Sequence, residues 1–322
     1  MKRALLYTGI LALLVAITLI ILFRSHSPFG SSNSEFTVKP EKEITRIEFS
    51  HDGNDLTLEK SGEKWLINGR KEARKGGISF IIRILTEMRI KSPVSPDVFE
   101  KEVSAEKLKP VQVKVFEGRK LLKSFMVYKT ASNQYGNIMK MKERSKPFIV
   151  QVPGFEVNIA SAFSLNELYW QPYTIFSMLP SEISSVKIEN FEDIASSFSL
   201  ARKGGEYVLS NSSGELKGWD QSLIIRYISY FTFIPFEKWA FEMKEDEKKI
   251  IKSTQPLFRI TIISHEGKKK VLTLWKKNET KDGTTVPDTD RLWGATDEST
   301  EIFYVRYFDI DPVLKKVSYF FN

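Results

Sequence analysis

The chain has 322 residues, of which 42% are hydrophobic and 27% charged, a composition typical of a globular protein and unlike that of a disordered chain. It contains no cysteine, which excludes disulfides, thiolate metal ligands and a lipid-modified cysteine. The net charge is +8, but lysines are interspersed with glutamates along the chain, and this pattern argues against a nucleic-acid-binding face.

The N-terminus contains an unbroken apolar run, residues Ala4–Phe23, without a single charge. As a helix this run would extend about 30 Å, the thickness of the hydrocarbon core of a bilayer. Lys2 and Arg3 precede the run and Arg24 alone follows it closely, so the positive-inside rule places the N-terminus in the cytoplasm. We therefore expect a single-pass signal anchor, with lipid around residues 4–23 and an extracytoplasmic body. The alternative is a cleaved signal peptide, whose apolar core is usually shorter, about 7–15 residues.

After the anchor (residues 1–24) and a tether (residues 25–42), the body begins with a strand over Ile44–Phe49, where apolar and polar residues alternate. A hairpin follows, with a turn at residues 61–63 and Trp65 just after it. A helix is then predicted around Ser79–Leu85. Three further strands complete this first copy, over residues 111–116, 121–128 and 148–152.

The same order recurs in the second half of the body. Ile183–Ile188 alternates like Ile44–Phe49, a hairpin turn falls at residues 203–205, and Tyr207 stands where Trp65 stands in the first copy. A helix follows over Ser222–Ile228, and then three strands over residues 257–263, 271–275 and 303–307. The chain therefore predicts an α+β fold with a duplicated β-β-β-α-β-β-β unit, in lobes over residues 43–168 and 169–322, each an antiparallel sheet with a helix on one face.

These features resemble a bacterial family described as domain of unknown function 4340. The resemblance rests on the repeated Ile-x-x-Ile strand, the Gly-Glu-Lys-Trp65 hairpin, the helix, the proline-led hairpins and the joint at residues 168–183, and it covers roughly residues 40–320. It implies an envelope protein of the bacterial inner membrane with a periplasmic body, often encoded beside ABC-type transport components linked to gliding motility. It implies no catalytic residue.

Motifs for chemistry are mostly missing from the sequence. The chain has no phosphate-binding Gly-x-x-x-x-Gly-Lys-Ser/Thr loop, no Gly-x-Ser-x-Gly nucleophile elbow and no His-x-x-x-His metal spacing. Only three histidines occur, and His51 and His265 are each followed by a carboxylate and a glycine, which is typical of a hairpin turn. We therefore expect no enzyme activity, no cofactor and no metal.

The longest difference between the copies is Asn278–Thr300, rich in Asp with Gly283, Pro287 and Gly294. We expect a solvated loop here, with a partner-contact loop and an oxygen-ligand metal loop as the alternatives. Trp293 within it is a candidate contact residue. The segment Tyr230–Phe241 holds more large aromatics than one buried face needs, so Phe236 and Trp239 are further candidate partner contacts.

The sequence thus favours a non-catalytic, membrane-anchored extracytoplasmic module that assists an ABC-type permease and ATPase or another envelope machine, without binding nucleic acid. One alternative is an envelope hydrolase, which needs two carboxylates converging in a pocket with separated pKa values. Another is a membrane-tethered scaffold or adhesin, which predicts exposed aromatic residues without a transporter partner.

Overall fold

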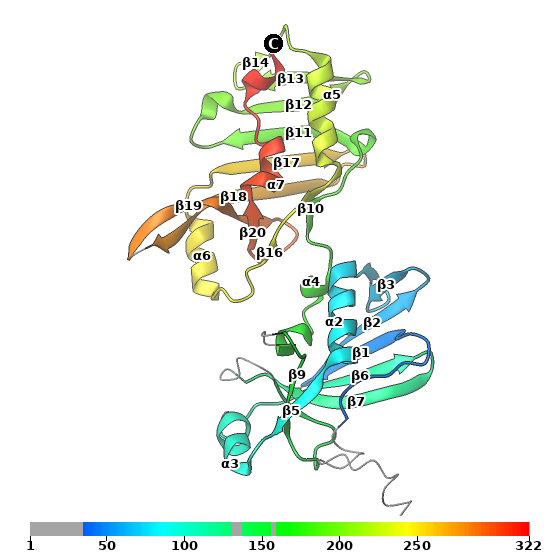
Figure 1. The fold of residues 1–322 in the computed structure, drawn as a ribbon. Helices are drawn as coiled ribbons and strands as arrows, with labels where there is room; N and C mark the ends of the chain where they lie inside the picture. The colour runs from blue at the N-terminus through cyan, green and yellow to red at the C-terminus, as the bar shows by residue number, and fades with distance from the viewer. Residues whose placement is uncertain (1–34, 131–136, 156–158, 282, 322) are drawn as a thin grey trace, which may run out of the picture. The chain divides into compact units, whose positions relative to one another are not determined.

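The computed structural model describes residues 35–130, 137–155, 159–281 and 283–321, which form two compact units that divide between Pro172 and Tyr173 (Figure 1). Both units combine an antiparallel sheet with a few helices, which confirms the predicted α+β class. The predicted anchor at residues 4–23 lies outside the described residues. In the part of the chain that is described, no helix is long and apolar enough to cross a membrane.

The first unit is built on a nine-stranded antiparallel sheet in the order β4-β3-β2-β1-β6-β7-β8-β9-β5. Its strands are β1 Arg46–His51, β2 Asn54–Ser61, β3 Lys64–Ile67, β4 Lys71–Glu72, β5 Arg89–Pro93, β6 Val111–Glu117, β7 Lys120–Tyr128, β8 Asn137–Lys140 and β9 Phe148–Gln151. Its helices are α2 Lys75–Glu87, α3 Pro96–Phe99 and α4 Glu167–Trp170. The alternation predicted for the first strand places Ile47 and Phe49 in the core, and α2 buries Ile81 and Leu85 in the same core.

The N-terminal residues that the structure describes belong to this core. Phe36 is 1% exposed and packs edge-to-face on Phe125 and Phe148, at ring-centroid distances of 6.1 and 6.3 Å. The Val38 amide donates to the Leu85 carbonyl at 2.8 Å. The expected tether over residues 25–42 is therefore too long at its C-terminal end. Its Phe36-x-Val38 alternation covers only two apolar residues, which is too few to predict a packed segment from sequence.

The second unit has a sheet of nine strands in the order β14-β13-β12-β11-β17-β18-β19-β20-β16. Its strands are β11 Ile183–Asn190, β12 Phe198–Lys203, β13 Glu206–Asn211, β14 Gly214–Glu215, β16 Lys238–Trp239, β17 Phe258–Ser264, β18 Lys269–Lys281, β19 Thr284–Thr296 and β20 Phe303–Arg306. A separate pair joins β10 Thr174–Phe176 to β15 Ile234–Pro235. The helices are α5 Gln221–Ser229, α6 Glu245–Ser253 and α7 Tyr307–Ile310.

Aromatic side chains hold α5 on this second sheet. Tyr227 of α5 is fully buried, packs on Phe198 of β12 at a ring-centroid distance of 5.5 Å, and donates its hydroxyl to the Val313 carbonyl at 2.8 Å. Burial raises the pKa of Tyr227 well above its ordinary value, so the hydroxyl stays a donor. The hydrogen bond satisfies the one polar group that this large side chain brings into the core.

The two units share one strand order, because each strand of the first sheet has a counterpart at the same place in the second. The repeated lobes expected from the sequence are thus present, but each sheet has nine strands where six were predicted. The missed strands are β4, β5, β8, β14, β16 and β19. Three of them have only two residues, too short for an alternating pattern, and β19 lies in the segment expected to be a loop.

Candidate functional site

The segment expected to be a solvated loop is largely strand. β18 and β19 have 13 residues each, but β17 pairs with β18 only as far as Leu274, and β20 pairs with β19 only from Arg291. Lys276 still pairs with Leu292, which also pairs with β20, whereas residues 278–281 and 284–287 pair only with one another within the described sheet. We call this two-stranded extension the arm, and it projects from the sheet in Figure 1.

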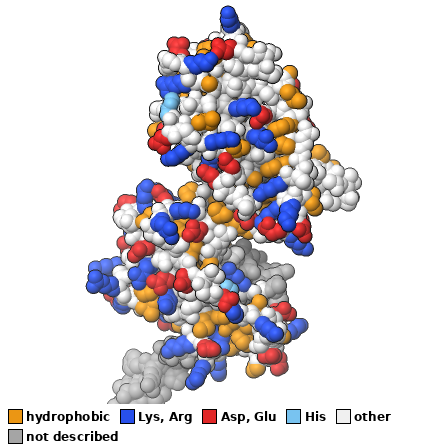
Figure 2. All heavy atoms as spheres, turned by 180° about the vertical axis from the view of Figure 1, so that it is seen from behind, with side chains coloured by type: hydrophobic (Ala, Val, Ile, Leu, Met, Phe, Trp, Pro, Cys, Tyr) orange, Lys and Arg blue, Asp and Glu red, His pale blue; other side chains and the backbone are white. Residues whose placement is uncertain are grey.

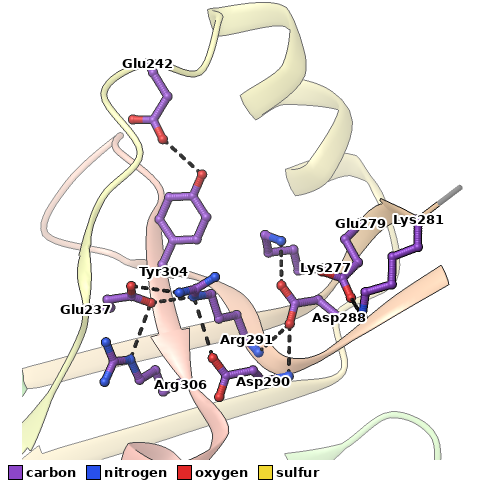
Figure 3. Close-up of polar contacts among 10 residues, drawn as sticks. All are labelled: Glu237, Glu242, Lys277, Glu279, Lys281, Asp288, Asp290, Arg291, Tyr304 and Arg306. Carbon is purple, nitrogen blue, oxygen red and sulfur yellow. Dashed lines mark hydrogen bonds and ion pairs between the residues drawn. The ribbon is translucent and has the colours of Figure 1, made fainter. Parts of the chain in front are cut away.

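Asp288 fixes the base of the arm. Its side chain is 5% exposed, and its Oδ1 accepts hydrogen bonds from the backbone amides of Asp290 and Arg291, at 2.9 and 3.0 Å. Its Oδ2 accepts from Lys277 Nζ at 2.6 Å, across the two strands (Figure 3). Burial opposes the charged form of Asp288, but these hydrogen bonds outweigh it, so the pKa of the carboxyl group is lowered.

A second ion pair joins the base of the arm to Glu237, the residue just before the edge strand β16. Arg291 of β19 donates to both carboxylate oxygens of Glu237, from Nε at 2.6 Å and from Nη2 at 3.1 Å. Arg306 of β20 approaches the same carboxylate, with Nε at 3.6 Å (Figure 3). Partial burial opposes ionisation of Glu237, but the two guanidinium groups lower its pKa. The carboxylate thus bridges two strands with a geometry that fixes their spacing.

Tyr304 extends this polar network on the face of β20 that also carries Arg306. Its hydroxyl donates to Glu242 Oε1 at 3.0 Å, and Lys238 Nζ lies 4.7 Å from its ring centroid. Burial, together with the Glu242 carboxylate, raises the pKa of Tyr304 to about 12, so the hydroxyl remains protonated near neutral pH. The ring of Trp293 packs against it with centroids 4.6 Å apart.

This arrangement suits a rigid support better than proton-transfer chemistry. Glu237 and Asp288 both have lowered pKa values and are already bonded to cations, so neither is a proton donor near neutral pH. No group of three or more His, Cys, Asp or Glu side chains among the described residues is arranged to hold a metal ion.

Carboxylates also line a cavity of about 510 Å³ in the second unit, the feature that bears most directly on the hydrolase alternative. Its three glutamates are each engaged. Glu182 Oε2 accepts from the Leu179 amide at 2.6 Å, Glu266 pairs with Lys268 at 2.8 Å, and Glu298 pairs with Lys270 at 2.8 Å. The pKa of Glu266 is lowered by Lys268, which does not match a general acid.

The structure brings two of the three predicted contact residues together, since the rings of Phe236 and Trp239 pack with centroids 4.8 Å apart, and places Trp293 elsewhere. Trp293 is half-buried at the base of the arm, where Lys277 Nζ lies 5.7 Å from its ring centroid. Phe236 and Trp239 are 5% and 9% exposed and pack on Phe303 in the core, so they present little surface to a partner. The exposed aromatics of that segment are instead Phe233, at 63%, and Phe241, at 36%.

Large exposed hydrophobic side chains are more numerous on the second unit than on the first. Of the ten in the described chain, only Val98 and Leu121 belong to the first unit. The other eight are Leu179, Ile194, Ile225, Phe233, Phe241, Ile250, Phe308 and Phe321. On the face of this unit seen in Figure 2, hydrophobic side chains lie among interspersed Lys, Arg, Asp and Glu.

Sequence reasoning missed Glu237, Arg291 and Arg306, because their pairing joins residues far apart in the chain. Asp288 was noticed only as one of several acidic residues. A usable signal was present in the arm, where Lys277, Glu279 and Lys281 alternate before the dipeptide Asp282-Gly283, a pattern typical of a hairpin.

Comparison with known proteins identifies no matching family model, no matching curated protein and no matching solved structure. The resemblance drawn from the sequence motifs therefore stays a prediction.

Proposed function

We propose that this chain is a non-catalytic, membrane-anchored module that binds a partner in the bacterial envelope through its second unit, with the arm as the main contact element. The single observation that carries the proposal is an arm whose base is fixed by Asp288 and Arg291 while its strands lack other sheet neighbours. A two-stranded extension without other sheet neighbours is marginally stable by itself, and fixing its base lowers the entropy lost on binding.

The membrane part of the proposal rests on the apolar run Ala4–Phe23 and its flanking charges. The partner class rests on the family resemblance, which implies an ABC-type permease and its ATPase. The exposed apolar residues of the second unit are consistent with such an accessory role, since they offer area for a stable contact.

The test is recovery of partners from cells that carry the tagged full-length chain, by crosslinking in vivo, mild detergent extraction and mass spectrometry. One variant shortens the arm by replacing residues 280–285 with Asn-Gly. The closing pair is then Glu279 with Val286, which are opposite one another in the native register. The matched control is Lys203→Ala with Glu206→Ala at the tip of the β12–β13 hairpin, which is also exposed.

We expect the wild type and the control to recover the same membrane partner, and the shortened arm to lose most of it while keeping its thermal unfolding midpoint. A further variant, in which a cleavable signal replaces Met1–Phe23, is expected to lose the partner as well. Equal recovery by the shortened arm would show that the arm is not the contact, and a chain that recovers no partner would overturn the proposed function.

A further inference from the structure

The net charge is distributed unequally between the two units. Residues 25–172 contain 24 Lys and Arg against 18 Asp and Glu, whereas residues 173–322 contain 21 against 22. The excess is concentrated in residues 114–146, where nine basic residues accompany only Glu117 and Glu143. A surplus confined to one part of one unit calls for a local explanation rather than one of general solubility.

The fold brings much of this surplus to one end of the first sheet. β8 pairs antiparallel to β7 with Lys140 opposite Met126, so the chain after Lys140 continues alongside the β7 residues that precede Met126. Lys123 lies among those residues. The β6–β7 turn, at Gly118 and Arg119, lies at the same end. We call this surface the basic end, made up of Arg119, Lys123, Lys142, Arg144 and Lys146.

Most of these cations have no acidic partner among the described residues. Arg119, Lys142, Arg144 and Lys146 are exposed, and none of them forms an ion pair with a residue that the structure describes. Neighbouring Lys120, in contrast, pairs with Glu41 at 2.7 Å. The positive charge of the basic end is therefore available to an external anion, although salt screens it.

The N-terminal segment enters the first unit beside this surface. Lys123 Nζ donates to the backbone carbonyl of Glu35 at 2.9 Å, and Phe36 packs on Phe125 of β7 and Phe148 of β9. Only 11 residues, Arg24–Ser34, separate Glu35 from the apolar run. Fully extended, they reach about 40 Å, so an inserted run would keep Glu35 within roughly that distance of the bilayer.

We infer that the basic end binds the anionic headgroups of the bilayer in which residues 4–23 are inserted. The inference rests on the proposed membrane anchor and adds a second, electrostatic contact that sets which end of the first unit faces the lipid. The chemistry fits, because exposed Lys and Arg side chains near a membrane are attracted to anionic lipid over about a Debye length. Such a contact strengthens the attachment given by the anchor, because a short tether keeps the basic end at a high effective concentration near the headgroups.

The test uses the full-length chain in proteoliposomes of phosphatidylcholine alone or with one quarter phosphatidylglycerol. Because the chain has no cysteine, a single introduced cysteine can be labelled specifically with a fluorescent donor. One label site is Leu121→Cys in β7, and the other is Asn54→Cys in β2, at the opposite end of the sheet. Energy transfer to an acceptor-labelled lipid reports how near each end lies to the membrane. The test variant is K142E/R144E/K146E, and the matched control is K249E/K268E/K269E, three exposed lysines of the second unit.

We expect phosphatidylglycerol to raise energy transfer from the donor at Leu121→Cys but not from the donor at Asn54→Cys. Salt at 0.5 M should remove this increase. The K142E/R144E/K146E variant should lack the increase, whereas the K249E/K268E/K269E control should keep it. Equal transfer in both lipid mixtures, with the chain still resistant to carbonate extraction, would overturn the headgroup contact and leave the anchor in place. A chain that carbonate releases would overturn the anchor, and the headgroup inference with it. Unchanged thermal midpoints show that the variants fold.

Discussion

Asp288 illustrates how one buried carboxylate can hold a projecting hairpin. It accepts two backbone amides of its own strand and the ammonium group of Lys277 on the facing strand. A buried charge is costly unless its hydrogen-bonding capacity is filled, and here three donors fill it. Glu237 does the same for Arg291 and Arg306. Together these two carboxylates hold the two strands in place at the base of the arm.

We predict that Asp288→Asn lowers the free energy of unfolding by about 1–3 kcal/mol at neutral pH, because Lys277 loses its buried counter-charge. The pKa of Asp288 is lowered on folding, so its stabilising contribution is present above the ordinary value of 3.8 and is lost as the pH falls through the folded value. The difference between wild type and variant should therefore be constant above about pH 5 and shrink below about pH 4. Urea unfolding between pH 2.5 and pH 8 measures it.

The control is Asp290→Asn, two residues along the same strand. Its carboxylate is 66% exposed and lies 3.8 Å from Arg291, so its removal is expected to change stability by less than about 0.5 kcal/mol. If both variants lose the same stability, or if the loss for Asp288→Asn is unchanged at pH 3, the buried pair is not what fixes the arm.

At the scale of elements, the sequence predicts the strands and helices whose residues show a local periodic pattern. The first strands of each copy, the hairpins after them and the helices α2 and α5 were all visible in alternation and helical spacing. The arm was not predicted, since its Asp, Gly and Pro residues are typical of loops and outweighed the short alternation of Lys277, Glu279 and Lys281. Glu237 with Arg291 was invisible for the same reason: the pair joins two elements 54 residues apart.

The β19–β20 pair contains a position that a larger residue cannot occupy. Gly294 lies beneath the ring of Phe303, and a Cβ there would sit 2.5 Å from Phe303 Cε2 and 2.8 Å from Val305 Cγ2. We predict that Gly294→Ala destabilises the second unit by about 1–3 kcal/mol through overpacking. Thr296→Ala, on the same strand and half-exposed, should stay within about 0.5 kcal/mol. Equal urea midpoints for the two variants would show that the sheet relaxes around the added methyl group.

At the scale of the whole molecule, the chain consists of two units with one strand order and different surfaces. The first carries the excess of positive charge, and the second carries the arm and most of the exposed hydrophobic side chains. The surfaces of the two units can differ in this way because residues outside the core can change without disturbing the sheet.

Each unit has its own sheet, helix and aromatic core, so we predict that residues 35–172 and residues 173–321 fold when produced separately. Each fragment should show a cooperative urea transition and the circular dichroism of mixed sheet and helix. A fragment that binds a hydrophobic dye and unfolds without a cooperative transition would show that its core is incomplete. Chains split inside a sheet, between β7 and β8 or between β18 and β19, serve as controls that should not fold.

The outermost strands of the two sheets have a consequence for how copies of the chain meet at high concentration. β4, β14 and β16 have two residues each, and β5 (Arg89–Pro93) carries a lysine, a proline and an irregular register against β9. Short, charged or interrupted edges are poor templates for another strand. Edge-to-edge pairing of these sheets between copies is therefore disfavoured at β4, β5, β14 and β16, and the strands that stay open to such pairing are those of the arm.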